Sequence, residues 1–256
     1  MADHSIAIPP EGSLALLAAG HTALRAWRVA RGPDWAASLK PLSAPDGASG
    51  EPPTRAASRE VPSADVLSRL RLVVVSGLPR SGTSMMMQML VAGGAEAYTD
   101  THRAPDESNP RGYYEHEAVT RLQRDARWLA DADGKAVKVV APLLEALPVG
   151  PSYTVVFMDR DLDAVVRSQA AMLGHAGAPP ADLAQSFRRF QRQSLDWAER
   201  TSGAHLLRLD YAEVLARPRD VADRVAGFIG EHALLALEPE RMAAAVDPSL
   251  HRHLPR

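Results

Sequence analysis

The sequence contains no cysteine, which excludes disulfides, thiolate metal sites and cysteine nucleophiles. An excess of charge is also lacking, because the formal net charge is only −2, so nothing global indicates binding to nucleic acid or to an anionic membrane. No apolar run approaches the roughly 18 residues of a membrane span. The first residues, MADHSIAIPPEG, lack the positive region of a signal peptide. We therefore expect a cytoplasmic globular protein without a nucleic-acid partner.

Composition divides the chain into three parts. Residues 1–40 form an N-terminal helical segment, in which leucines at helical spacing predict a helix over about 12–31. This helix is predicted to pack on the main domain, with a role in homodimerisation or acceptor docking as the alternative. Residues 41–66 are rich in Pro, Ser and Gly and are interpreted as a linker. Residues 67–256 are long enough for a folded domain.

In this domain, apolar runs that are typical of strands alternate with helical patterns. Strands are predicted at 72–76, 136–140, 153–158 and 205–209. Helices are predicted at about 82–92, 115–130, 161–174 with Asp161 as N-cap, 181–200, and from Pro218 to just before Gly230. This alternation predicts an α/β fold with a central, mainly parallel sheet flanked by helices.

The first strand runs into the sequence GLPRSGTS, which has the G-x-x-x-x-G spacing of a phosphate-binding loop. In such a loop successive backbone N–H groups point inward, and the following helix adds its positive end. The predicted anion ligands are Gly77, Pro79, Arg80, Ser81, Gly82, Thr83 and Ser84. An ATPase or GTPase loop carries lysine where this chain has Thr83, so Arg80 would take that role. The order of strand, loop and helix predicts a P-loop NTPase-like three-layer fold; the alternative is a tight turn without a ligand.

A second pair of polar residues follows the strand at 153–158. Arg160 stands at the end of this strand, and Ser168 lies eight residues further on, about two turns into the next helix. A guanidinium and a hydroxyl placed in this way can converge on one dianion. The alternative is a surface arginine paired with Asp161 or Asp163, and a serine that faces solvent.

The run Pro-Arg-Ser-Gly-Thr-Ser resembles the 5′-phosphosulfate loop of sulfotransferases that use 3′-phosphoadenosine 5′-phosphosulfate (PAPS). In that family an Arg and a Ser spaced like Arg160 and Ser168 hold the 3′-phosphate. LDYAEVLARP resembles the segment whose tyrosine lies near the adenine, which implies that role for Tyr211 rather than a place in the core. AVKVVAP resembles the strand that carries a catalytic lysine, which implies Lys138, with an edge-strand lysine as the alternative.

The resemblance extends over about residues 70–250 to bacterial proteins described as sulfotransferase-family. It implies in-line transfer of a sulfuryl group from PAPS to a hydroxyl or amine of an unidentified acceptor, which leaves adenosine 3′,5′-bisphosphate (PAP), without an obligatory metal. Arg80 and Lys138 would neutralise charge on the leaving phosphate. The remaining hypotheses are a small-molecule kinase that uses ATP and magnesium, and a nucleotide-binding module without activity.

The catalytic base is the open part of this interpretation. Cytosolic sulfotransferases carry a histidine where this chain has Val140, and other branches use a glutamate about twenty residues after the loop. The candidates are Asp100 and Glu115, with His102, Glu107 and His116 as rivals. Tyr113 and Tyr114 in the same segment belong either to an acceptor-facing lid or to the loop's anchor. Arg103, Arg111 and the tail HRHLPR are further sources of positive charge.

Overall fold

The computed structural model describes residues 59–100, 109–172 and 181–250. The predicted N-terminal helix, most of the predicted linker, His102, Arg103, Glu107 and the tail from residue 251 lie outside these ranges. Five parallel strands form one sheet in the order β2-β3-β1-β4-β5. Their bounds are β1 Arg71–Gly77, β2 Ala97–Tyr98, β3 Ala136–Lys138, β4 Ser152–Asp159 and β5 Ala204–Asp210. The four predicted strands are confirmed, and β2, with two residues, is the strand that apolar periodicity does not indicate.

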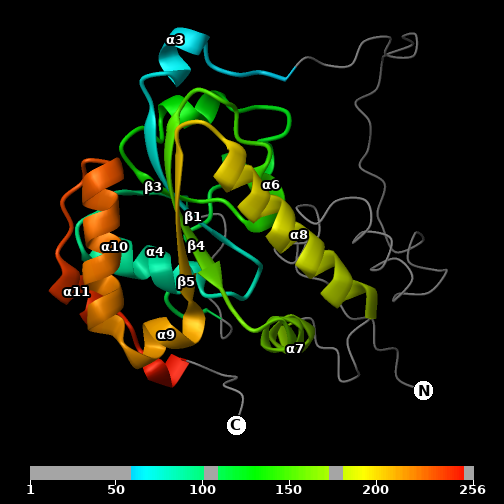
Figure 1. Cartoon of the computed structure of the whole chain (residues 1–256), viewed down its shortest axis with the longest axis vertical. Coiled ribbons are helices and arrows are strands. Elements are labelled where there is room, and N and C mark those ends of the chain that lie inside the picture. The colour runs from blue at the N-terminus through cyan, green and yellow to red at the C-terminus, as the bar shows by residue number, and fades with distance from the viewer. Residues whose placement is uncertain (1–58, 101–108, 173–180, 251–256) are drawn as a thin grey trace, which may run out of the picture.

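Helices cover both faces of the sheet. Their bounds are α3 Ala64–Leu67, α4 Thr83–Ala92, α5 Glu117–Thr120, α6 Ala141–Leu144, α7 Leu162–Met172, α8 Ala181–Arg200, α9 Tyr211–Ala216, α10 Pro218–His232 and α11 Pro239–Ala244, with 3-10 turns at Arg127–Ala130 and Pro248–Leu250. Figure 1 shows α4, α10 and α11 on one side of the strands, and α6 and α8 on the other. The predicted α/β fold is therefore confirmed, and it is consistent with a P-loop NTPase-like three-layer fold.

Alternate side chains of β1 point to opposite faces of the sheet, which explains why helices pack on both faces. Leu72 and Val74 pack in a core cluster with α6, whereas Val73 and Val75 pack in a second cluster with α4, α10 and α11. On the α4 side, methionines fill the space above the sheet, and Met86 is fully buried. Each such side chain contributes about 1.5–3 kcal/mol when it is fully buried. The loop after β1 thus follows a strand that is buried on both faces.

Two predicted helices need correction. The helix predicted at 115–130 is a short α5 followed by turns and a 3-10 turn, because the Asp125 carboxylate accepts a hydrogen bond from the Arg127 backbone N–H at 3.0 Å and offers the chain an alternative to a helix. The last predicted helix continues through Gly230 to His232. By contrast, Asp161 caps α7 as predicted, since its Oδ1 accepts from the Ala164 N–H at 2.8 Å.

The described end of the predicted linker, residues 59–66, packs on the domain. Arg59 donates from Nε to the Leu122 carbonyl at 3.1 Å, and Glu60 pairs with the segment around Asp125 through two backbone hydrogen bonds. Ser63 caps α3. The folded domain therefore extends at least to Arg59 rather than starting at residue 67. In the described ranges, α-helices are too short or too polar to cross a membrane.

Candidate functional site

The candidate site lies at the carboxyl ends of the strands, around β1, which has β3 and β2 on one side and β4 and β5 on the other. In parallel sheets of this kind, ligands bind in the crevice outside these strand ends. β1 leads into the loop before α4, β4 leads into α7, and β5 leads into α9. Figure 1 shows α7 and α9 at the same end of the sheet. The residues that follow these strands are therefore brought together by the register of the sheet.

Gly77 and Gly82 shape the loop because no side chain fits at either position. Gly77 has a φ of 148°, and a Cβ atom there would lie 2.4 Å from Ser81 Oγ and 2.6 Å from the Met158 carbonyl oxygen. Gly82 has a φ of 99° and directly precedes α4, and a Cβ atom there would lie 2.4 Å from Cδ2 of Tyr211. Both glycines thus permit close approach as well as left-handed backbone.

Arg80 adopts left-handed backbone, with a φ of 68°, although it is not glycine. Such a residue stores strain of about 1–3 kcal/mol, which the surroundings must offset. Two contacts do so: Arg160 donates from Nη1 to the Arg80 carbonyl at 2.8 Å, and Arg80 donates from Nε to Oγ of Ser168 at 3.1 Å. The loop arginine and the Arg160/Ser168 pair, predicted from separate motifs, therefore belong to one cluster.

Tyr211 completes this cluster. The register pairs Asp159 of β4 with Asp210 of β5, so Arg160 and Tyr211, which follow them, lie side by side. The guanidinium carbon of Arg160 lies 4.4 Å from the centre of the Tyr211 ring, in the geometry of a cation–π contact.

The charges in this cluster favour an anion. Burial lowers the pKa of Arg160, and the nearby Arg80 lowers it further, because each guanidinium disfavours the charge of the other. Burial likewise raises the pKa of Tyr211, opposed by Arg160 and Arg80. A bound anion would stabilise both cations and remove part of this penalty.

Two hydroxyl groups at the loop are buried without a hydrogen-bond partner among the described residues. Ser81 has only 1% of its surface exposed, and its Oγ is unpaired; the same holds for Ser76 at the end of β1. A buried polar group without a partner costs about 1–3 kcal/mol. The Ser81 hydroxyl, which belongs to the loop itself, is a donor that an anion bound there would satisfy.

Lys138 stands on β3, opposite Val75 of β1, and its side chain is only 5% exposed. Its ammonium group donates to Oε1 of Glu115 at 3.0 Å, to the Tyr113 carbonyl at 3.0 Å and to Oγ of Ser84 at 3.2 Å. Ser84 in turn donates to the same Tyr113 carbonyl at 3.3 Å. Lys138 and Ser84, both candidate site residues, thus lie in contact, and Glu115 joins them. The Tyr113 carbonyl was missed, because a backbone group has no sequence signature.

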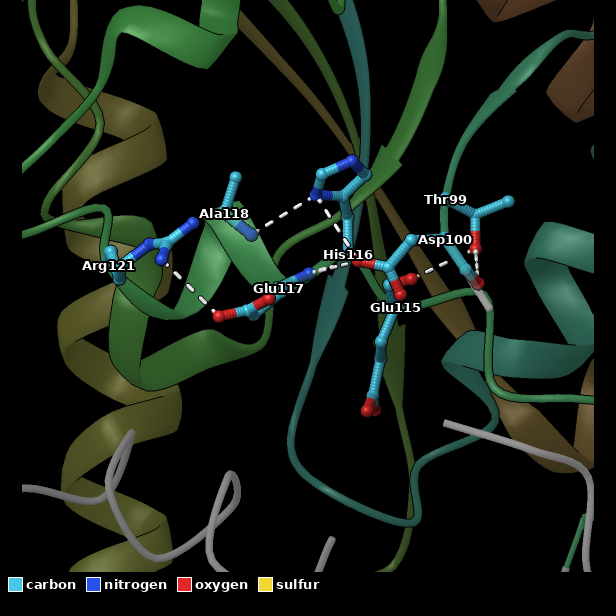
Figure 2. A network of polar contacts seen from close by, with 7 residues as sticks. All are labelled: Thr99, Asp100, Glu115, His116, Glu117, Ala118 and Arg121. Atoms are coloured by element: carbon cyan, nitrogen blue, oxygen red, sulfur yellow. Dashed lines mark hydrogen bonds and ion pairs between the residues drawn. The ribbon is translucent and has the colours of Figure 1, made fainter. Parts of the chain in front are cut away.

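Asp100, the other candidate base, has a structural role. Its Oδ2 accepts from the Glu117 backbone N–H at 2.6 Å, and its own N–H donates to the Glu115 carbonyl at 3.1 Å. Figure 2 shows the Asp100 carboxylate at the start of the helical turn that carries Glu117 and Ala118, while the Glu115 side chain extends away from it. Asp100 therefore binds the first backbone N–H of α5, whose N-cap is His116, and positions the backbone of Glu115.

His116 belongs to the same network. Its Nδ1 lies 3.5 Å from Oδ2 of Asp100, which by distance alone is an ion pair. The same atom accepts from the Ala118 N–H at 3.1 Å, however, and a nitrogen that accepts a hydrogen bond carries no proton. The contact with Asp100 is therefore not an ion pair. The His116 ring stacks on Tyr98, with ring centres 4.1 Å apart, which holds it on the side of the network away from Glu115.

The remaining candidates are anchors. Tyr113 is buried, and Tyr114, with a φ of 53°, packs against the cluster formed by α4, α10 and α11. Arg111 donates to the Ala245 carbonyl and to Asp247, both at 2.8 Å, so it ties this segment to the end of α11. No group of three or more metal-ligating side chains occurs in the part of the chain that the structure describes.

The fold and the loop thus define an α/β protein whose first strand leads into a phosphate-loop-like turn before α4. No protein-family model matches the chain, and no curated protein matches it either.

Proposed function

We propose that the protein is a sulfotransferase that takes a sulfuryl group from PAPS and passes it to a hydroxyl or amine of an acceptor. One observation carries the proposal: Arg80, Arg160, Ser168 and Tyr211 converge at a loop that has Thr83 where a triphosphate loop has lysine. Two cations and a hydroxyl beside the loop suit a second phosphate, which PAPS carries at its 3′ position and ATP does not. The resemblance in the loop motif points to the same donor.

The residues present fit such a donor. The loop offers the buried Ser81 hydroxyl and the N-terminus of the ten-residue α4, whose backbone N–H groups favour an anion. The Tyr211 ring, which packs on Gly82 and under Arg160, offers a flat apolar surface to an adenine. Arg160 and Ser168 would hold the 3′-phosphate, and Gly77, Pro79, Arg80, Ser81, Gly82, Thr83 and Ser84 the 5′-phosphate.

When bound, PAPS supplies a sulfuryl group whose bond to the 5′-phosphate oxygen breaks as a bond to the acceptor oxygen or nitrogen forms. Arg80 and Lys138 place positive charge where the leaving phosphate oxygen keeps the electron pair. Glu115 receives the acceptor proton, because its carboxylate lies beside Lys138 whereas that of Asp100 is bound to α5. Rigid positioning by the sheet supplies the remaining advantage.

A thermal-shift titration tests the proposal, with PAP, ADP and ATP plus magnesium as ligands. At about a hundred times its dissociation constant a ligand adds about 2.7 kcal/mol of stability, which raises Tm at about 2–4 °C per kcal/mol. We expect PAP to stabilise the wild type selectively, and Arg160→Ala to lose this effect. Arg200→Ala is the matched control, because Arg200 lies at the opposite end of the sheet and donates within α8. Equal or better stabilisation by ATP with magnesium would overturn the sulfotransferase and favour the kinase instead.

Binding of PAP does not distinguish an active enzyme from a nucleotide-binding module without activity. Turnover is therefore measured as well. With sulfur-labelled PAPS, transfer of label to a pool of phenols, alcohols and amines marks an active enzyme. Selective PAP binding without transfer to any acceptor in that pool, and without slow transfer to water, would favour the module without activity.

A further inference from the structure

Lys138 holds three oxygens of its own chain. An ammonium group has three N–H donors, and the contacts to Glu115, Tyr113 and Ser84, at 3.0, 3.0 and 3.2 Å, are enough to use all of them. A phosphate oxygen that is to bind Lys138 must therefore displace one of these three partners.

Glu115 is the partner that can leave most easily. The Tyr113 carbonyl is part of the backbone between Gly112, with a φ of 89°, and Tyr114, with a φ of 53°, so moving it means rebuilding a turn. Ser84 sits in the first turn of α4 and also donates to that carbonyl. The Glu115 carboxylate, by contrast, ends a flexible side chain that is 21% exposed and extends away from Asp100 and His116 (Figure 2).

Building on the proposed function, we propose that Glu115 and the leaving phosphate of the donor compete for Lys138, so that donor binding releases the Glu115 carboxylate for use as the base. The exchange replaces one anion beside Lys138 by another, so the buried ammonium keeps a counter-ion throughout. No bond to hydrogen breaks in this step, and Lys138 stays protonated.

The exchange gives the reaction an order. While the ammonium touches Glu115, it stabilises the charged carboxylate and makes it a poor proton acceptor. Once Lys138 turns to phosphate, the carboxylate gains proton affinity and accepts the acceptor's O–H or N–H proton. Glu115 therefore becomes a competent base only when the donor is in place.

The test is the affinity for PAP, measured by isothermal titration calorimetry without any acceptor. Glu115→Gln weakens the hold on Lys138, so we expect tighter binding of PAP, by between about threefold and about a hundredfold, the range of coupling between contacting residues in a network. Glu115→Asp keeps the negative charge but shortens the side chain, so it should also tighten binding. Glu115→Asp retains a negatively charged carboxylate beside Lys138. It can therefore still test the competition if Glu115→Gln does not fold.

Two controls separate competition from simple charge repulsion. Asp100→Asn removes the same charge from a neighbouring carboxylate that accepts from the Glu117 backbone N–H, and it should leave the PAP affinity unchanged. In a Lys138→Gln background there is nothing to compete for, so adding Glu115→Gln should have no effect on affinity.

The outcomes are distinct. Equal affinity of the wild type and both Glu115 variants would overturn the competition while leaving the proposed function intact. Tightening that persists in the Lys138→Gln background, or that Asp100→Asn reproduces, would also overturn it, in favour of repulsion between charges. If PAP binds none of the proteins, the proposed function fails, and the competition fails with it.

Discussion

Arg80 donates a hydrogen bond from Nε to Oγ of Ser168, 88 positions further along the chain, at 3.1 Å. The bond joins the loop after β1 to the helix after β4, and these two strands are neighbours in the sheet. Two motifs that are far apart in the sequence are therefore one structure. An anion bound at either motif would therefore affect the position and charge of the other motif's side chains.

The first prediction concerns this bond. Ser168→Ala should lower the affinity for PAP by about 10- to 100-fold, because a hydrogen bond to a charged group is worth about 1.5–3 kcal/mol. The fold should persist, since Ser168 is replaced by a residue that suits the middle of a helix. Calorimetric titration of the wild type and the variant measures the change.

Ser202→Ala is the control for this prediction. Ser202 is exposed in the turn before β5, at the opposite end of the sheet, so its loss should leave the PAP affinity unchanged. An equal loss in both variants, or none in Ser168→Ala, would show that the Arg80–Ser168 contact has no part in binding.

The second prediction separates two roles of glycine in the loop. Gly82→Ala should destabilise the protein by left-handed strain, about 1–3 kcal/mol, and by the clash of its Cβ with the Tyr211 ring, which adds about 1–3 kcal/mol. Gly94→Ala is the matched control: its φ is 106°, but nothing lies within 4 Å of the new Cβ. Urea unfolding of both variants gives the free energy of unfolding.

The difference between these two variants isolates the packing of Tyr211 on the loop. We expect Gly82→Ala to be the less stable of the two and to lose PAP binding, whereas Gly94→Ala should bind PAP as the wild type does. Equal destabilisation in both would mean that the ring moves aside at no cost.

The sequence was informative where the spacing of residues is fixed by local geometry. β4 is paired in register with β1, so Arg160, which follows β4, must lie near the loop that follows β1. Ser168 lies two helical turns later in the regular helix α7, so it must lie near the same loop. The same holds for Tyr211, which follows the strand that pairs with β4. In each case one strand end and one helix determine the position.

The choice of base could not be predicted in this way. Asp100 and Glu115 lie in a region where the chain turns at Gly112 and Tyr114, both with positive φ, and no periodicity predicts that path. The partner of each carboxylate comes from elsewhere: a backbone N–H of α5 for Asp100, and Lys138 of β3 for Glu115. A distance of about twenty residues from the loop therefore favoured Asp100, whereas the contacts favour Glu115.

The third prediction tests the structural role of Asp100. Asp100→Ala should lose the hydrogen bond to the Glu117 N–H in the first turn of α5 and reduce the free energy of unfolding by about 1 kcal/mol, the usual net contribution of one hydrogen bond. Asp100→Asn should be nearly as stable as the wild type, because its amide oxygen can still accept the Glu117 N–H. Neither variant should bind PAP more weakly. If Asp100→Asn folds normally but abolishes sulfuryl transfer, Asp100 is the base after all.

The fourth prediction is a dependence of stability on pH. Burial raises the pKa of Tyr211, against the opposing effect of Arg160 and Arg80. Because the unfolded state releases this proton at about pH 10, the stability that the neutral phenol contributes is fully present below that pH. It is lost as the pH rises from about 10 through the higher value of the folded state, since the unfolded state then binds fewer protons.

Tyr211→Phe makes this contribution measurable, because it keeps the ring beneath Arg160 and removes only the ionisable hydroxyl. The difference in free energy of unfolding, wild type minus variant, should be constant near pH 8 and should fall above about pH 10, by at most about 1.4 kcal/mol per pH unit. The other tyrosines with raised pKa values, Tyr98 and Tyr153, are present in both proteins and cancel in the difference. A difference that stays constant or grows with pH would mean that the Arg160 and Arg80 charges outweigh the burial of this phenol.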